Sequence, residues 1–361
     1  MLVKIKDKNL YYVGGVVRDN YLNCQSKDVD YCYEGDAIEF TKSWNVIKTN
    51  SDFGTVKVLF DGEEIDIAST RVEEYPKAGH LPVVTQIGCP IIKDLERRDF
   101  TINAMARNTI TGEVIDYFNG QDDLKYKKIR VLHEKSFIDD PSRIIRALKF
   151  SVRFGFELDE NTKKLQDTYL ENVNYDMSYY RLKKELIDSF NLNNNRIYEL
   201  FNEQKLYRLI NKNATNPNIK GDLVGLINKF NPKLKYMVFL SLFDLDNFEL
   251  TSEEKFIKIS YDSIRNFYSN DDYEIYKNFN EIPLESVLAY AVSVDNKIAM
   301  KYLEKLKDIK ISITSYDLID MKIPQGKIYQ EIFDFLLEKK IQNPDLTLEE
   351  EKFLIKRFFL C

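Results

Sequence analysis

The sequence predicts an α+β protein in which a mixed α/β N-terminal part precedes an almost wholly helical remainder. Two observations predict this division. Short strand-like runs and a hairpin signal, with its turn at Asp61-Gly62, fall before about residue 130. From Asp139 onward, apolar residues recur at helical spacing and polar links separate the segments. A chain of 361 residues exceeds one simple core, so we expect about two to four domains.

The N-terminal elements follow from local signals. A strand at 10–13 runs into a turn at Gly14-Gly15, a helix covers 16–22, and a second strand covers 28–33. Asp36 is a helix cap, and the helix after it is expected to run to about residue 46. Hairpin arms are predicted at 53–60 and 64–68. Residues 72–92, punctuated by proline and glycine, are predicted to be irregular, and a further hairpin-like stretch ends near 116–120.

The helical part begins with recognisable start signals. Asp140-Pro141 combines a capping aspartate with a first-turn proline, and apolar residues at 144, 145, 148 and 152 follow at helical spacing. Ser178 can cap another helix. The remaining sequence alternates amphipathic helices with short polar links.

Composition restricts the classes of function. The net charge of −6 and a pI near 5.4 argue against a broad basic surface for nucleic acid, but they permit a local basic groove. Four cysteines without Cys-x-x-Cys spacing and two histidines predict neither a structural zinc site nor a disulfide framework. The N-terminus does not resemble a signal peptide, and no apolar run is long enough to span a membrane. We therefore expect a reduced, cytoplasmic setting.

Two aspartates one residue apart form the leading candidate site. Asp28 and Asp30 would project from the same face of a strand, and paired carboxylates of this kind suit a hard cation such as Mg²⁺. Gly14 and Gly15, just upstream, would let backbone amides approach a phosphate. Asp66, on the second hairpin arm, adds a third acid. A solvated strand face is the alternative for the Asp-x-Asp pair alone, but the glycine turn and the third acid favour a metal-dependent nucleoside triphosphate site.

A second set of residues suits the rest of a nucleotide. Arg97 and Arg98 can bind phosphate oxygens, whereas Asp99 and Asn103 suit ribose hydroxyls. The alternative is a surface turn with a local Arg–Asp pair of little energetic value.

A third set lies on two predicted helices. Asp140 and Arg143 are three residues apart, so they share one side of a helix start and could read a base edge; simple capping is the alternative, and the two roles can coexist. Arg181 and Glu185, four apart, are expected to form a helix-surface or interhelix ion pair with a structural role.

Taken together, these segments resemble the class II (bacterial-type) tRNA nucleotidyltransferases of the polymerase β superfamily. The matching segments occur in order: GGVVRD at 14–19, DVD at 28–30, RRDFTINA at 97–104, IRV at 129–131, DDPSRIIR at 139–146, and SYYR at 178–181 with Glu185. The chain departs from the family where Asp139 and Tyr180 replace residues that are usually, or commonly, glutamate.

The resemblance implies roles for these residues. Asp28 and Asp30 would bind two Mg²⁺ ions, and Asp66 would be the third catalytic acid. The nucleotide would contact Gly14, Gly15, Arg18, Arg98, Asp99, Asn103, Asp140, Arg143 and Arg146. Asp139, Arg181 and Glu185 would support this pocket.

The implied architecture is a nucleotidyltransferase head at 1–133, a helical neck at 134–200, a body at 201–300 and a tail at 301–361. The implied function is template-independent addition of CCA to tRNA from CTP and ATP. The implied partner is the tRNA acceptor arm, with no membrane or DNA partner. Basic runs at 125–130, 181–184 and 301–310 are candidate RNA contacts, although solvated helix faces would look the same.

The long loop at 71–97 resembles the loop that CC-only members of the family lack, and the segments at 313–318 and 323–326 resemble the tail of tRNA-specific members. The resemblance therefore implies full CCA addition. The absence of a basic C-terminal extension argues against a poly(A) polymerase. The alternatives are an A-adding enzyme, a poly(A) polymerase relative and a non-catalytic RNA-binding relative.

Overall fold

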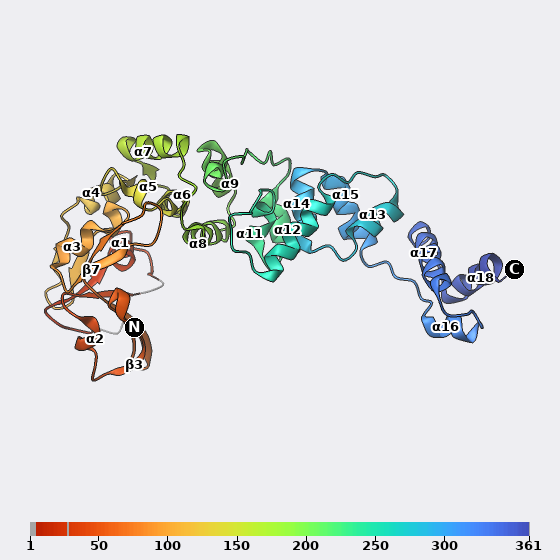
Figure 1. The fold of residues 1–361 in the computed structure, drawn as a ribbon, viewed down its shortest axis with the longest axis horizontal. Coiled ribbons are helices and arrows are strands. Elements are labelled where there is room, and N and C mark those ends of the chain that lie inside the picture. The colour runs from red at the N-terminus through yellow and green to blue at the C-terminus, as the bar shows by residue number, and fades with distance from the viewer. Residues whose placement is uncertain (1–4, 27–28, 361) are drawn as a thin grey trace. The chain divides into compact units, whose positions relative to one another are not determined.

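The computed structural model describes residues 5–26 and 29–360 of the chain. It divides into two compact units (Figure 1). The first contains residues up to Asn216 together with Asp246–Glu249, and the second contains Pro217–Leu245 and the chain from Leu250 onward. The N-terminal unit combines sheets with helices and the second is helical, so the predicted α+β class is confirmed.

Within the described part of the first unit, seven strands form one sheet in the order β3-β4-β5-β2-β1-β8-β9. Its strands are β1 (Leu10–Val13), β2 (Asp30–Tyr33), β3 (Asn45–Asn50), β4 (Thr55–Phe60), β5 (Glu63–Ser69), β8 (Ala106–Asn108) and β9 (Val114–Ile115). The contact between β2 and β5 is parallel, and the other neighbours are antiparallel. The sheet therefore joins the predicted Asp-x-Asp strand directly to the second hairpin arm.

Alternating side chains give the sheet two buried faces. Tyr31 and Ile67 belong to one apolar cluster, whereas Cys32 belongs to another that includes Ile91 and Leu95 of α3 (Ile91–Glu96). Because successive strand residues point to opposite faces, Asp30 lies on the same face as Cys32.

The hairpin is as predicted, but the helix after Asp36 is not. Asp61 and Gly62 both have positive φ, of 50° and 83°, as the tight turn between β4 and β5 requires. Asp36 does cap α2 (Ala37–Phe40) by accepting hydrogen bonds from the amides of Ile38 and Glu39. The prediction of a helix to residue 46 was wrong, because α2 ends at Phe40 and the chain turns into the exposed edge strand β3.

The predicted irregular segment is also partly regular. β6 (Arg71–Glu74) pairs antiparallel with β7 (Val83–Ile87), and α3 begins at Ile91. The proline and glycine residues mark the connection between the two strands. The loop was predicted correctly from these residues, but β6 and β7 on either side of it were not predicted.

The other helices and short helices of this unit are α1 (Gly15–Tyr21), η1 (Ser51–Phe53), η2 (Thr101–Asn103), α4 (Gly120–Lys125), α5 (Ser136–Asp139), α6 (Ser142–Phe154), α7 (Glu160–Glu171), α8 (Tyr179–Phe190), α9 (Asn195–Glu203) and η3 (Leu206–Leu209). β10 (Lys128–Ile129) pairs parallel with β11 (Glu157–Leu158). The cap of α6 is Pro141, one residue later than predicted, although Asp140 still accepts a hydrogen bond from the amide of Ser142 at 3.1 Å. Ser178 occupies the cap position of α8 without a side-chain capping bond.

The second unit consists of α10 (Leu223–Phe230), α11 (Lys235–Leu240), α12 (Ser252–Ile264), α13 (Asp272–Phe279), α14 (Leu284–Ser293), α15 (Asn296–Lys301), the π-helical η4 (Tyr302–Leu306), α16 (Ser315–Asp320), α17 (Lys327–Gln342) and α18 (Leu348–Phe359). Helix α14 of this unit is buried along most of its length. In the part of the chain that the structure describes, no helix has the length and apolar character needed to cross a membrane.

Candidate active site

Two of the three predicted catalytic acids are neighbours on the central sheet. Asp30 on β2 and Asp66 on β5 are register partners, so their side chains project from the same face. Both residues are exposed, whereas Ile65 and Ile67 on either side of Asp66 are buried on the opposite face. The predicted alternation of the hairpin arm is thus confirmed. Asp28 lies outside the described residues.

The same row of the sheet carries a lysine that was not among the predicted site residues. Lys57 on β4 is the register partner of Asp66, and its Nζ lies 2.9 Å from Asp66 Oδ2. Asp30 and Asp66 offer adjacent carboxylate oxygens, which are the ligands that Mg²⁺ prefers. Their placement therefore fits a divalent cation. Among the residues described, without Asp28, no group of three or more His, Cys, Asp or Glu side chains is gathered closely enough to hold a metal.

The glycine turn brings backbone close to two arginines. Gly14 adopts φ 65°, and a Cβ atom built on it would lie 2.9 Å from Nη1 of Arg98. Arg18, one turn into α1, is buried against Asp19 and donates from Nη1 to Asn103 Oδ1 at 2.6 Å. Any other residue would be strained at this positive φ, and its Cβ would displace the Arg98 guanidinium.

Arg98 is held by a carboxylate that the sequence analysis did not single out. Asp94 on α3 is fully buried and accepts from Arg97 Nη2 at 2.7 Å and from Arg98 Nη2 at 2.9 Å. Burial alone would raise the pKa of Asp94, but the two guanidinium groups bring it below its ordinary value. The Nε of Arg98 is buried without a hydrogen-bond partner in the described structure. Asp94 precedes Arg97 and Arg98 by three and four residues, and this helical spacing was the available sequence signal.

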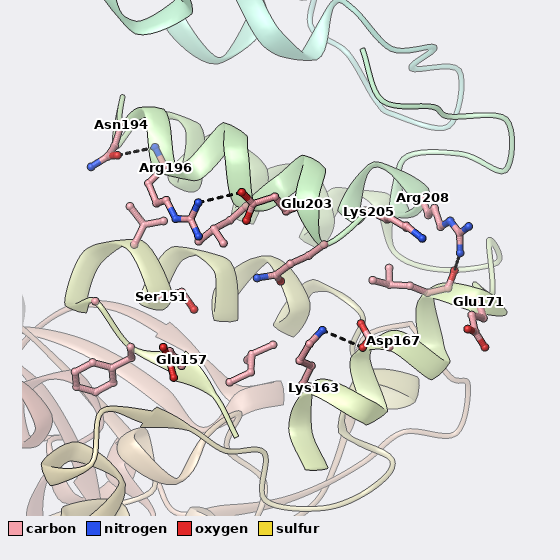
Figure 2. Close-up of a pocket in the computed structure, with 17 residues that line it drawn as sticks. Ser151, Glu157, Lys163, Asp167, Glu171, Asn194, Arg196, Glu203, Lys205 and Arg208 are labelled. Atoms are coloured by element: carbon pink, nitrogen blue, oxygen red, sulfur yellow. Dashed lines mark hydrogen bonds and ion pairs between the residues drawn. The ribbon is translucent and has the colours of Figure 1, made fainter. Parts of the chain in front are cut away.

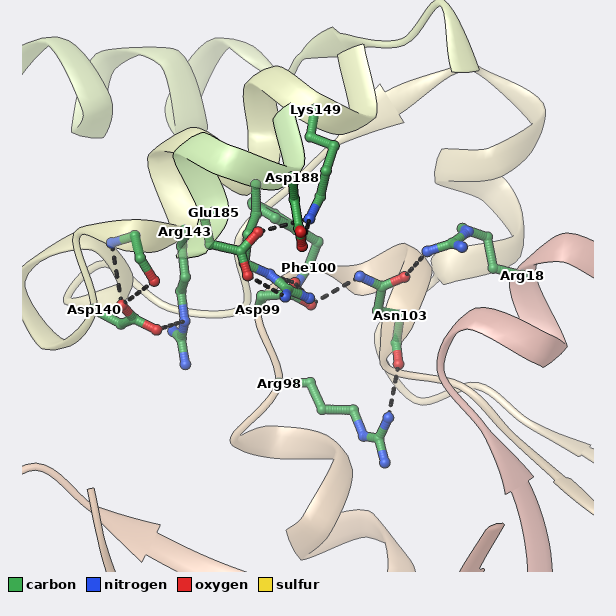
Figure 3. A network of polar contacts seen from close by, with 12 residues as sticks. Arg18, Arg98, Asp99, Phe100, Asn103, Asp140, Arg143, Lys149, Glu185 and Asp188 are labelled. Atoms are coloured by element: carbon green, nitrogen blue, oxygen red, sulfur yellow. Dashed lines mark hydrogen bonds and ion pairs between the residues drawn. The ribbon is translucent and has the colours of Figure 1, made fainter. Parts of the chain in front are cut away.

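Asp99 is the centre of a buried polar network (Figure 3). Its Oδ1 accepts from the amide of Phe100 at 2.8 Å and from Asn103 Nδ2 at 2.9 Å, and its Oδ2 accepts from Arg146 Nε at 2.7 Å. Burial opposes ionisation, but Arg146 and Asn103 lower the pKa of Asp99 to about 2. The carboxylate is therefore ionised at neutral pH.

The network continues from α6 to α8. Glu185 accepts from Arg146 Nη1 at 3.1 Å and from Lys149 Nζ at 2.7 Å. Burial would raise the pKa of Glu185, but Arg146 and Lys149 lower it. Arg181 and Glu185 do not pair with each other along α8, because Arg181 reaches Asp140 and Glu185 reaches α6. Helix packing, rather than spacing along one helix, selects both partners.

The predicted base-reading pair is buried and fully engaged. Asp140 accepts from Ser142 Oγ at 2.6 Å through Oδ1 and contacts Arg181 through Oδ2. Arg143 donates to Ser136 Oγ at 2.7 Å and to the Arg97 carbonyl at 3.1 Å. A longer contact of 3.5 Å joins Arg143 Nη2 to the hydroxyl of Tyr75.

A cavity of about 620 Å³ collects most of the predicted residues. Predicted residues that line it are Gly15, Arg18, Asp30, Arg98, Asp99, Asn103, Asp140, Arg143, Arg146, Arg181 and Glu185. Arg97, predicted with Arg98 as a phosphate ligand, also lines it, and the lining residues that were not predicted are Glu73, Tyr75, Ser142, Lys149, Phe150, Arg153, Tyr180 and Lys184. Predicted residues outside the lining are Gly14, Asp66 and Asp139; the Asp139 carboxylate instead lies 4.0 Å from His133 Nδ1.

A larger cavity of about 960 Å³ contains none of the predicted residues (Figure 2). It lies between the end of α6, α7 and α9, and two ion pairs lie among its lining side chains. Lys163 binds Asp167 at 3.0 Å, and Arg196 binds Glu203 at 3.1 Å. The smaller cavity is therefore the candidate active site.

Comparison with known proteins gives the family of this chain. Residues 10–130 match the poly A polymerase head domain. An A-adding tRNA nucleotidyltransferase of Aquifex aeolicus is 31% identical over 92% of this chain and 45% of its own length. One from Geobacter sulfurreducens is 42% identical over 43% of the chain and 18% of the relative, and one from Halalkalibacterium halodurans is 29% identical over 90% and 82%. The chain thus spans less than half the length of the first two relatives.

A solved structure, the apo form II of a CCA-adding enzyme, has a TM-score of 0.79 at 28% identity and covers 96% of this chain and 91% of its own. The structural similarity covers the head and the helical part together. With the matching head domain and the relatives above, it supports a class II tRNA nucleotidyltransferase.

Proposed function

We propose that this chain completes the 3′ end of tRNA by adding CCA from CTP and ATP. In each addition, the terminal 3′-hydroxyl oxygen forms a bond to the α-phosphorus. The bond from that phosphorus to the bridging oxygen breaks, and pyrophosphate leaves. Relatives in the same structural family include a CCA-adding enzyme with CTP, one with ATP, and one from Thermotoga maritima with tRNA. The proposed setting is cytoplasmic.

The charge of the candidate cavity carries the proposal. Nine arginine and lysine side chains line it, against five carboxylates, although the chain as a whole has a net charge of −6. Such a local excess of positive charge matches a triphosphate and an RNA backbone.

Phosphate binding is best supported at the turn after β1. The buried Nε of Arg98 lacks a protein acceptor, and Arg98 lies against Gly14. A phosphate oxygen at this turn would supply that acceptor, while backbone amides approach from the glycine side. Asp94 fixes Arg98 by ion pairing, so the donor is oriented before the nucleotide arrives.

The acids of the sheet would hold the metal. Asp30 and Asp66, with Asp28 as the predicted third member, would bind Mg²⁺, which supplies neutralisation of the triphosphate and of the attacking oxygen. Lys57 Nζ contacts Oδ2 of Asp66. A bound cation would therefore take the other oxygen of this carboxylate or displace Lys57.

Base selection would use Asp140 and Arg143 after a small exchange of contacts. Both are engaged by protein groups, so an incoming base must replace at least one contact. The 3.5 Å contacts from Arg143 to the Tyr75 hydroxyl and to the Ser136 carbonyl are longer than its bonds to Ser136 Oγ and to the Arg97 carbonyl. Tyr75 lines the cavity, so we propose that the contact to Tyr75 is the one exchanged.

Addition of A alone is the second candidate, because the three relatives described above are A-adding enzymes. Three tRNA transcripts, ending before CCA, after C or after CC, separate the two. Each is offered CTP and ATP, separately and together, with Mg²⁺. Growth of all three to CCA supports the proposal, whereas extension of only the CC-ended transcript by one A assigns A addition. Long A tails would indicate poly(A) synthesis, and no extension by a folded protein would indicate a binding relative.

The helical neck, body and tail, predicted at 134–200, 201–300 and 301–361, are proposed to hold the tRNA acceptor arm through its backbone and shape. This mode suits an enzyme that accepts many tRNA sequences.

A further inference from the structure

We propose that Tyr180 is a stacking surface for the 3′-terminal base of the RNA being extended. This inference rests on the proposed function and names a residue that positions the second substrate. Tyr180 lines the candidate cavity, yet 71% of the residue is exposed. Single exposed tyrosines are common on protein surfaces, so the inference depends on where Tyr180 lies.

The adjacent tyrosine shows what a structural aromatic does at this helix start. Tyr179 packs edge-on against Phe248 with ring centroids 5.0 Å apart, and its hydroxyl accepts a hydrogen bond from Asn247 Nδ2 at 3.1 Å. These contacts secure the start of α8 within the first unit. Tyr180, one residue later, leaves most of its surface to solvent at the edge of the cavity. Its ring is therefore available to a ligand.

The burial of Asp140 and Arg143 indicates where the nucleotide and the RNA would each bind. Asp140 and Arg143 are 3% and 4% exposed, so the incoming base has to reach inward to contact them. Tyr180 is far more exposed and is joined to this pair through its neighbour Arg181, which binds Asp140. In-line attack requires the reacting oxygen and phosphorus to lie about 3–3.5 Å apart, so the last base of the RNA must sit beside the incoming one. The exposed side of the cavity, where Tyr180 lies, is left for that RNA base.

The neighbouring cations complete a site for single-stranded RNA. Lys184, one turn further along α8, and Arg153 of α6 line the same cavity. Aromatic rings combined with such cations bind single-stranded nucleic acid with little sequence preference, because every base has a π face. A sequence-tolerant surface suits this reaction, since the terminal base changes after each addition.

Binding of an RNA minihelix that ends in 2-aminopurine, without added nucleotide, tests the contact directly. Stacking on Tyr180 should quench the probe. Tyr180→Phe should retain the quenching, whereas Tyr180→Ala and Tyr180→Glu should lose it and weaken binding by roughly five- to a hundredfold. Tyr117→Ala is the matched control, because Tyr117 is 60% exposed and does not line the cavity.

Steady-state kinetics give the second measurement. With Tyr180→Ala, the KM for the tRNA transcript should rise by a similar factor while the KM for CTP stays unchanged. A rise confined to the KM for CTP would assign Tyr180 to the incoming base and overturn the inference. Unchanged quenching and unchanged KM values, in an enzyme that still extends tRNA, would also overturn it without touching the proposed function. Failure of the wild-type protein to extend any transcript would instead reject the proposed function.

Discussion

Replacing Asp99 by asparagine removes one negative charge from the centre of the site with almost no change in shape. The amide oxygen can still accept from Phe100 and Asn103, but the amide nitrogen then faces the Arg146 guanidinium in place of Oδ2. Asp99→Asn therefore isolates the value of the ionised carboxylate opposite Arg146.

The magnitude follows from the pKa of Asp99, which falls from an ordinary value of 3.8 to about 2 in the folded protein. Because the folded pKa is the lower one, the stabilisation is complete above the unfolded value and is lost as the pH falls through about 2. The difference corresponds to about 2 kcal/mol of unfolding free energy at neutral pH. Roughly half of it should be gone at pH 3.

Urea unfolding, monitored by tryptophan fluorescence, measures the unfolding free energy of the first compact unit, which contains Asp99. Trp44 is the only tryptophan of the chain, and its ring packs against Phe40 and Phe60 in the same unit as Asp99. The unfolding free energies of the wild type and Asp99→Asn are compared at pH 7, 5 and 3. Asp52→Asn, at an exposed position of the same unit, is the control and should differ little from the wild type.

The expected difference in unfolding free energy between the wild type and Asp99→Asn is about 2 kcal/mol at pH 7 and pH 5, and it decreases toward pH 3. A gap of the same size at pH 3 would refute the reasoning, because a cost independent of carboxylate ionisation would come from packing alone. A gap near zero at pH 7 would show that solvation offsets the pairing with Arg146.

Three further outcomes are expected. Asp94→Asn leaves two buried guanidinium groups short of their shared carboxylate and should lower the unfolding free energy by roughly 3–5 kcal/mol, measured by the same urea titration. Gly14→Ala forces a Cβ against Arg98 at a positive φ and should raise the KM for CTP and ATP together by roughly tenfold; unchanged values would remove the turn from phosphate binding. Arg143→Ala should reduce the selectivity between CTP and ATP more than it weakens triphosphate affinity. Competition between the two nucleotides measures the selectivity.

Local chemistry explains which parts of the fold were predictable. The Asp61-Gly62 turn defines its hairpin because both residues must adopt positive φ, a requirement that neighbouring residues cannot change. The capping signal of Asp36 was equally local and correct, but a cap says where a helix begins and not where it ends. The edge strand β3 is exposed along its whole length, so it carries no alternating apolar pattern that would have contradicted a longer helix.

The candidate site was predictable where ordered motifs mark it and unpredictable where packing assembles it. Strand alternation was enough to place Asp66 on the opposite face from Ile65 and Ile67, whereas its register with Asp30 depends on the pairing of β2 with β5. Lys57 and Lys149 could not be predicted as part of the site, because their partners lie on other elements, β5 for one and α8 for the other. Tyr75 was missed for a related reason, since the strand before it lies in a segment that was predicted to be irregular.

The polar network also changes the role expected of Asp99 and Asn103. Arg18 binds Asn103, Asn103 binds Asp99, and Asp99 binds Arg146, which is held in turn by Glu185 (Figure 3). Every oxygen of Asp99 already accepts a strong hydrogen bond, so direct binding of a ribose hydroxyl would have to share or replace one. The chain of contacts instead connects the phosphate end of the site, on α1, to α6 and α8.

We therefore expect Asp99→Asn to alter triphosphate affinity through Arg18 as well as through any contact with the sugar, and a 2′-deoxynucleotide distinguishes the two effects. If Asp99 acts on the sugar alone, the variant and the wild type should bind the deoxynucleotide equally. If it acts through the network, the variant should bind both nucleotides more weakly.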